Sequence, residues 1–341
     1  MVRSVALLLL MLCGGARAQA ILDSAAVPHL PQSGRASYEA FLLVNLPRAF
    51  AVSSDGKMGW QTGGTIETAR EKALASCANK GGKDCAIYAE NLQVVWQGRK
   101  PEALTPVPGP LFGGSGWEFV PDQHYFWRGP AAARGVYVFG HGTAATTQGN
   151  RDARGFQPHS YVRHFNNNGY DVIRFDRAPS TDLTDSAAGW LREGLRKVRA
   201  MGYRQVIVGG QSRGAWNSLQ ILDTAGLADV VIAVSAAAHG TDSMRQSANG
   251  MAELYQMFRS AAAPAARVAI VNFRNDPFEE NPDKRFALAD DLLAPRVAAL
   301  LKINQPEGIK GHGGGYSLDF ANRYSACLLR FATEAVPPAA C

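Results

Sequence analysis

A serine flanked by glycines carries the clearest chemical signal in this sequence. Ser212 lies in Gly210-Gln211-Ser212-Arg213-Gly214, between the apolar run 206–208 and a helix-like stretch over 215–222. A serine hydroxyl becomes a good nucleophile when a base removes its proton and a sharp strand-to-helix turn keeps it exposed. Glycines at 210 and 214 leave room for such a turn. The pattern therefore predicts a nucleophilic serine at the end of a buried strand.

An acid and a histidine follow this serine along the chain. A buried strand is expected over 267–273, and Asp276 comes just past its end. A further strand over 300–304 precedes a glycine-rich loop, 311–315, that contains His312. We expect Asp276 to orient the imidazole of His312, which would act on Ser212 as general base and then as general acid.

With this serine, acid, histidine order, residues 116–329 resemble the α/β-hydrolase superfamily. The resemblance implies an α/β fold with a mostly parallel sheet of about eight strands flanked by helices. It also implies a catalytic triad of Ser212, Asp276 and His312, in which the acid follows the carboxyl end of its strand.

Other residues compete for the two supporting roles. His239 is the one other histidine after Ser212 and is the alternative base. The alternative acids are Glu279, Glu280, Asp283 and Asp242.

Acyl transfer also needs donors for the oxyanion of the tetrahedral intermediate. The resemblance implies the backbone N–H of Arg213 as one donor. A strand over 135–139 leads into Gly140-His141-Gly142-Thr143, and the N–H of Gly142 or Thr143 is expected to be the second. His141 could be taken for a base or a metal ligand, but the resemblance implies a structural role.

The charge of Arg213 opposes the partial positive charge at the start of its helix, at a cost of about 0.3–1 kcal/mol. An internal ion pair with Asp176 or Asp152 is the favoured compensation, and an anionic group on the substrate is the alternative. Met251 and Met257 recur near helical spacing after residue 235, together with other apolar residues. Residues 241–263 form either a lid over an apolar substrate, in which these methionines and Arg213 bind substrate, or an ordinary packed helix.

Length and composition agree with a globular enzyme. The 341 residues are 46% hydrophobic, and the formal net charge is +6. Basic residues are scattered and lack interleaved aromatic residues, so no nucleic-acid partner is expected. His, Cys, Asp and Glu show no spacing typical of a metal site, and neither a metal nor another cofactor is expected.

The first 18 residues are typical of a secretory signal peptide. Arg3 precedes a short apolar run, and small residues precede the expected cleavage before Gln19. This run is too short to cross a bilayer, and no other apolar stretch of spanning length is found, so we expect a secreted or periplasmic protein without a transmembrane segment. The cysteines that remain after cleavage predict two disulfides, and the local pairs are Cys77–Cys85 and Cys327–Cys341.

A small α+β module is expected over 35–100, followed by a proline-rich and glycine-rich linker over 101–115 and the catalytic domain over 116–341. Within the module, strands are expected over 49–52 and 86–95, a turn region over 56–64 and a helix over 68–77. The module resembles small exported domains of unknown function that carry a cysteine pair. It either covers an edge or flank of the hydrolase sheet or makes contact with the cell envelope or substrate.

These features favour an exported serine hydrolase that cleaves a small-molecule carboxylic ester or other acyl substrate. A serine peptidase or amidase of the same fold is the nearest alternative. A binding or cell-envelope protein with an idle triad is the alternative from a different class.

Overall fold

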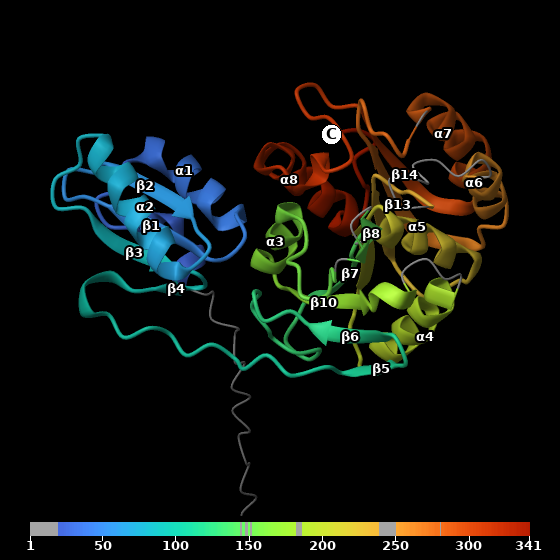
Figure 1. Ribbon diagram of the computed structural model, residues 1–341, viewed down its shortest axis with the longest axis horizontal. Coiled ribbons are helices and arrows are strands. Elements are labelled where there is room, and N and C mark those ends of the chain that lie inside the picture. The colour runs from blue at the N-terminus through green and yellow to red at the C-terminus, as the bar shows by residue number, and fades with distance from the viewer. Residues whose placement is uncertain are drawn as a thin grey trace, which may run out of the picture.

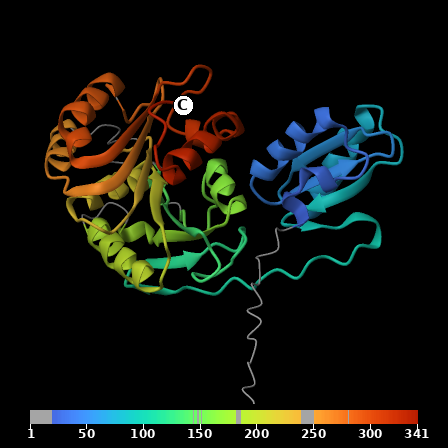
Figure 2. The same cartoon turned by 180° about the vertical axis from the view of Figure 1, so that it is seen from behind.

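The computed structural model describes residues 20–143, 145–146, 149–150, 152–181, 186–238, 250–279 and 281–341. The signal peptide expected over 1–18 and its cleavage site lie outside these residues. Figure 1 shows a small N-terminal module beside a larger domain, and Figure 2 shows the same two parts from behind. The strands are β1 (Arg48–Val52), β2 (Met58–Thr62), β3 (Ala86–Glu90), β4 (Gln93–Val94), β5 (Phe112–Gly114), β6 (Trp117–Pro121), β7 (Gly135–Gly140), β8 (Ala145–Thr146), β9 (Gly149–Asn150), β10 (Tyr170–Arg177), β11 (Val206–Gln211), β12 (Val230–Val234), β13 (Ala263–Asn272) and β14 (Val297–Asn304). The α-helices are α1 (Gln32–Leu43), α2 (Ile66–Asn79), α3 (Ser160–Asn167), α4 (Ser186–Ala200), α5 (Arg213–Gln220), α6 (Gly250–Arg259), α7 (Pro282–Leu288) and α8 (Leu318–Thr333).

The larger domain is built on an eight-stranded sheet with the order β14-β13-β12-β11-β7-β10-β6-β5. The six strands from β14 to β10 are mutually parallel, while β6 pairs antiparallel with β10 and β5 pairs antiparallel with β6. The mostly parallel, eight-stranded α/β-hydrolase fold that the sequence predicted is confirmed. Strand β7 lies between β10 and β11. The chain therefore passes from β7 to β10 on one side and later adds β11 on the other side, so the direction in which strands are added reverses at β7. Ligand sites of open α/β sheets form at the carboxyl ends of strands beside such a reversal.

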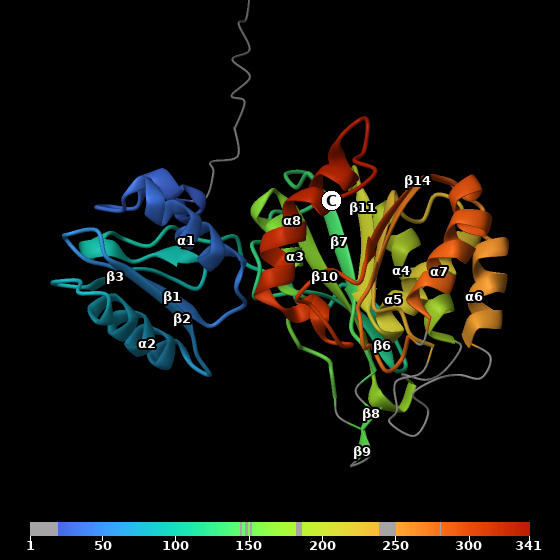
Figure 3. The same cartoon turned by 90° about the horizontal axis from the view of Figure 1, so that it is seen from above.

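Helices cover both faces of this sheet, as Figure 3 shows, with α3 and α8 on one side and α4 to α7 on the other. Alternate residues of β7 belong to the two hydrophobic cores, one on each face of the sheet. Val136 and Val138 belong to the core under α4 and α5, whereas Tyr137 and Phe139 belong to the core under α3 and α8. Both faces are buried, which explains why these strands are continuous apolar runs instead of alternating patterns.

The small module has a four-stranded antiparallel sheet with the order β2-β1-β3-β4, and its two helices also divide the residues of β1 between them. Phe50 and Val52 pack with α1, whereas Ala49 and Ala51 pack with α2. The cysteine pairs are Cys77–Cys85 within the module and Cys327–Cys341 at the end of the chain.

Two expectations for the module were wrong. The region 56–64, expected as a turn, contains β2. The glycine at 59 does not mark a turn there; it allows α2 to pack closely on the strand. A Cβ at Gly59 would lie 2.4 Å from the backbone nitrogen of Cys77. The strand expected over 86–95 is divided into β3 and β4 by Asn91, whose φ of 49° turns the chain.

The boundaries of both parts also differ from the expected ones. Ile21 and Val27 belong to the core of the module, so it begins before residue 35. Strand β5 pairs with β6, so the larger domain begins within the expected linker 101–115 rather than at 116.

The module docks on the helices α3 and α8 and leaves both outer strands of the large sheet, β14 and β5, uncovered by it (Figure 1). A reciprocal pair of hydrogen bonds joins the two parts: the amide of Gln157 donates to the Leu46 carbonyl at 2.6 Å and accepts from the Leu46 N–H at 2.9 Å. Asn167 of α3 donates to the carbonyl of Leu42, at the end of α1. The module therefore adds a layer outside a helix layer and does not cover a sheet edge.

The close approach of α5 to β7 yields a stability prediction. A Cβ at Gly214 would lie 2.1 Å from the carbonyl oxygen of Gly140. Neither backbone can move without disturbing the sheet, so Gly214→Ala should lower the free energy of unfolding by about 2–4 kcal/mol in urea denaturation. Gly189→Ala is the matched control, because a Cβ there meets no atom within 4 Å and alanine favours the helix α4. Equal stability of the two variants would contradict the packing described here.

Candidate active site

Ser212 occupies the turn between β11 and α5. Its φ of 54° and ψ of −119° are strained for a residue with a side chain, and the residue is 3% exposed. The glycines on either side permit the turn, because a Cβ at Gly210 would lie 2.5 Å from the Gly140 carbonyl oxygen. The serine is therefore held at the carboxyl end of the central strands by backbone packing on both sides.

The structure brings Asp276 and His312 into contact. Both carboxylate oxygens of Asp276 approach Nδ1 of His312, at 2.9 Å and 2.8 Å, and the carboxylate is fully buried. The N–H of Phe278 donates to the same carboxylate, and the ring of Phe278 packs 4.4 Å from the imidazole. With Nδ1 facing a carboxylate, Nε2 is the ring nitrogen that remains for proton transfer.

Backbone contacts hold the acid and histidine loops together. The N–H of Gly311 donates to the carbonyl of Arg274 at 2.8 Å, beside a parallel bridge between Arg274 and Lys310. The histidine loop also reaches the serine turn, because the side-chain amide of Gln211 donates to the carbonyl of His312 at 3.3 Å. The loops after β11, β13 and β14 therefore meet at one edge of the sheet, as strands that run in parallel require.

Gly142, one of the expected oxyanion donors, lies against the serine turn. A Cβ at Gly142 would lie 3.2 Å from Cβ of Ser212 and 2.2 Å from Oε1 of Gln211. Thr143 follows it, and Arg213 is the first residue of α5. All three expected donors thus belong to the two segments that adjoin Ser212.

His141 is buried beneath this turn, and backbone groups occupy both of its ring nitrogens. Its Nδ1 lies 2.7 Å from the carbonyl of Gly142, and its Nε2 accepts from the N–H of Arg177 at 2.9 Å. Burial, and then the charge of Arg177, lower the pKa of His141 to about 3. A neutral ring with both nitrogens occupied holds the Gly140–Thr143 loop in place, in agreement with the structural role expected for it.

The two acids expected to pair with the side chain of Arg213 pair with other arginines. Asp176 pairs with Arg174 at 3.0 Å, and Asp152 pairs with Arg154 at 2.6 Å. One of the contacts of Arg213 is a hydrogen bond that it donates to the carbonyl of Ala238 at 2.7 Å. Its guanidinium therefore fastens the segment that follows β12 to the first turn of α5.

Met257 and Arg213 share a groove of about 530 Å³ between α5 and α6. Met251 packs against the hydrophobic core instead. In the described part of the lid region, α6 buries Leu254 and Phe258 in the same core, as a packed helix does.

The competing residues have other surroundings. His239, Asp242 and Glu280 lie outside the described residues. Asp283 accepts from the side chains of Asn304 and Gln305.

Glu279, a competing acid, is buried beside Asp276 and pairs with Arg285 at 2.8 Å. Arg285 also donates to the carbonyl of Ala236 at 2.6 Å, so it links the acid loop to the segment after β12. The pKa of Glu279 is raised to about 8, chiefly by burial; the charge of Arg285 opposes this shift, and the charge of Asp276 adds to it. Sequence reasoning missed Arg285, Gln211 and Phe278, because their importance depends on which loops meet.

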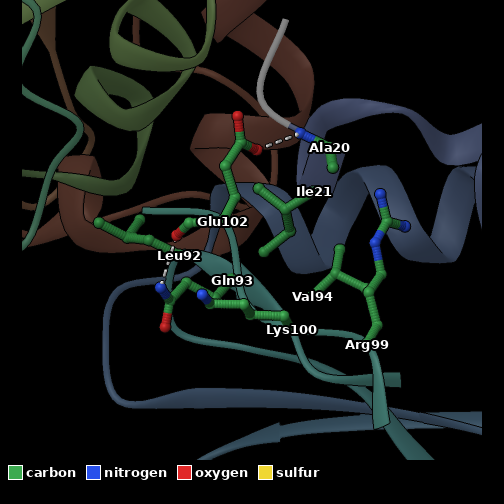
Figure 4. A pocket seen from close by; sticks show the side chains of 8 residues that line it. All are labelled: Ala20, Ile21, Leu92, Gln93, Val94, Arg99, Lys100 and Glu102. Carbon is green, nitrogen blue, oxygen red and sulfur yellow. Dashed lines mark hydrogen bonds between the residues drawn. The ribbon is translucent and has the colours of Figure 1, made fainter. Parts of the chain in front are cut away.

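A second cavity lies in the small module, away from Ser212. Figure 4 shows this space of about 380 Å³ between the first described residues and the segment after β4. Arg99, Lys100 and Glu102 line it, and the N–H of Ala20 donates to Glu102 at 3.3 Å.

Among the described residues, no three or more His, Cys, Asp or Glu side chains gather as a metal site would require. No helix within those residues has both the length and the apolar character needed to span a membrane.

The buried position of Glu279 predicts a pH effect on stability. Since its folded pKa is raised, folding favours the protonated form, and this contribution to stability is lost as the pH rises from about 4.5 through 8. Glu279→Gln should therefore make the unfolding free energy less dependent on pH between 5 and 8, as measured by urea denaturation at several pH values. The exposed Glu334→Gln is the control and should keep the wild-type slope. An unchanged slope in Glu279→Gln would contradict the assigned burial.

Comparisons with known proteins found no matching family model and no matching curated protein. Among solved structures, the chain is similar to an acylaminoacyl peptidase of Pyrococcus horikoshii, with 12% identity and a TM-score of 0.42 over 65% of this chain and 40% of that one. It is similar to the esterase Pf2001 of Pyrococcus furiosus, with 13% identity and a TM-score of 0.43 over 64% and 87% of the two chains. It is also similar to the bifunctional GH43-CE protein of Bacteroides eggerthii, with 13% identity and a TM-score of 0.42 over 62% and 35%. The chain thus spans well under half of the peptidase and of the bifunctional protein. By its own strand order and strand–helix turn, the larger domain has the α/β-hydrolase fold.

Proposed function

We propose that this protein is an exported serine hydrolase that cleaves carboxylic esters through an acyl-enzyme. The observation that carries the proposal is the contact of both Asp276 oxygens with Nδ1 of His312, at 2.8 Å and 2.9 Å, in a loop hydrogen-bonded to the residue before Ser212. A buried carboxylate in this position fixes the imidazole tautomer and stabilises its protonated form.

In the proposed reaction, Nε2 of His312 takes the proton of Ser212 while Oγ attacks the ester carbonyl carbon. Backbone N–H groups of Arg213 and of Gly142 or Thr143 donate to the resulting oxyanion. The tetrahedral intermediate then collapses, the C–O bond to the alcohol breaks, and His312 returns the proton to the leaving alkoxide. Water, deprotonated by His312, attacks the acyl-enzyme and releases the acid and free Ser212.

The ester is favoured over the amide because an alkoxide leaves more readily than an amine anion, so it demands less from the general acid. Export is supported by the signal-like first 18 residues and by two disulfides, which persist in oxidising compartments. Contact of the small module with the cell envelope would use the surface around Arg99 and Lys100, which is exposed.

Covalent labelling tests the nucleophile. A fluorophosphonate probe should label the signal-free, disulfide-intact protein at Ser212, as read by peptide mass spectrometry, because an activated hydroxyl attacks phosphorus as it attacks a carbonyl. Ser212→Ala and His312→Ala should both abolish the label. Ser317→Ala, which changes a helix-capping serine five residues after His312, is the matched control and should leave it intact.

Well-folded protein that takes up no label would overturn the proposal and favour a binding function for the fold. Labelling that persists in His312→Ala would mean that another residue activates the serine.

Kinetics test the substrate class and the role of Asp276. The protein should hydrolyse short-chain p-nitrophenyl esters with a kcat/KM at least about tenfold above that for the matching p-nitroanilides. The reason is that p-nitrophenolate leaves more readily than the corresponding anilide anion. Asp276→Asn should lower kcat by about 10³–10⁴-fold with little change in KM, because the carboxylate acts mainly on the transition state. Faster cleavage of the anilides would point to the peptidase or amidase alternative. A fall in kcat below tenfold for Asp276→Asn would remove that residue from the triad.

A further inference from the structure

Two arginines are fully buried where the small module meets the larger domain. Arg48 begins β1 of the module, and Arg163 lies on α3 of the larger domain; both are 0% exposed. A guanidinium group stays charged in proteins, so each brings a positive charge into the interior. Such a charge is costly unless an opposite charge and hydrogen bonds compensate for it.

Hydrogen bonds to uncharged carbonyl and amide oxygens compensate for part of this cost. Arg48 donates to the carbonyls of Phe41, Val44 and Asn91, at 2.8 Å, 3.1 Å and 3.0 Å. Arg163 donates to the His124 carbonyl and to the side chains of Asn45 and Gln157, at 3.0 Å, 3.3 Å and 3.0 Å. In the part of the chain that the structure describes, no carboxylate forms a salt bridge with either arginine.

Donors in this region remain without a partner among the described residues. They are Nη2 of Arg48, Nε of Arg163 and the hydroxyl of Tyr125, each with its atom buried. The guanidinium of Arg163 lies over the ring of Tyr125, 4.3 Å from its centroid. We name Arg48, Tyr125 and Arg163 the seam cluster.

The three residues also act on one another electrostatically. Burial, and then the charge of Arg163, lower the pKa of Arg48, while burial raises the pKa of Tyr125. Asp122 is the carboxylate whose charge acts on Arg163, but it lies 3.0 Å from Arg174 and 2.7 Å from His124. The positive charges of the seam cluster are therefore not balanced by a dedicated acid.

We propose that the seam cluster binds one monovalent inorganic anion of halide size, which joins the module to the larger domain. Such an anion would accept from the three buried donors and balance one of the two charges. The unpartnered groups are N–H and O–H donors, which a halide can accept from. The inference is independent of the chemistry at Ser212.

Anion-specific stabilisation tests the site, because a ligand that binds the folded state alone raises the unfolding midpoint. Thermal unfolding of the disulfide-intact protein is followed in sodium chloride and in sodium gluconate at equal ionic strength. Chloride should raise the midpoint by about 2–4 °C over gluconate. Arg48→Met should lose this difference, whereas the exposed Arg35→Met, on α1 of the same module, should keep it.

A bromide derivative tests the same proposal without a variant and decides the matter if Arg48→Met does not fold. Crystals of the wild-type protein grown in sodium bromide should give an anomalous peak within hydrogen-bonding distance of Arg48 Nη2, Arg163 Nε and the Tyr125 hydroxyl. A map without a peak there, or equal midpoints in chloride and gluconate, would overturn the proposal and assign these donors to water.

Discussion

The backbone of α5 comes so close to the end of β7 that side chains are excluded from both sides of the contact. Gly140, Gly210 and Gly214 converge there, and any of the added Cβ atoms would meet backbone. This contact allows the chain to turn from β11 into α5 over a single residue, Ser212, at a φ of 54°. The position of the serine relative to Gly142, and so the geometry proposed for the oxyanion donors, depends on it.

Parallel strand pairing then decides which loops can reach this turn. The strands β11, β13 and β14 all end at one edge of the sheet, so Asp276 and His312 are delivered to the same place although 36 residues separate them. Hydrogen bonds between backbone groups of the two loops reduce their freedom before any substrate binds. Orientation of this kind would lower the entropy that the proposed reaction must lose.

Buried arginines stabilise several loops by donating hydrogen bonds to backbone carbonyls. Arg213 and Arg285 hold the segment after β12, through Ala238 and Ala236, and so connect it to the serine turn and the acid loop. Arg48 and Arg163 act similarly where the module docks. Each such contact fixes a loop that lacks regular hydrogen bonding, at the cost of removing a charge from water.

The sequence by itself determined the elements whose signals are local. Apolar runs over 206–208 and 267–273 identified β11 and β13, because strands buried on both faces need continuous hydrophobic residues. Glycines around Ser212 identified the turn, and chain order placed Asp276 and His312 after the right strands. The fold class and the candidate residues could therefore be predicted.

Tertiary structure decided what depends on contacts between distant segments. Gly59 is the strand residue on which α2 packs closely, and Arg213 donates to a carbonyl of the segment after β12, whereas Asp176 and Asp152 pair with other arginines. The different surroundings of Asp276 and Glu279 also required the structure, because both acids lie in one loop: one faces His312 and the other Arg285. Local propensity cannot encode such choices, since they are set by how loops from different strands pack against each other.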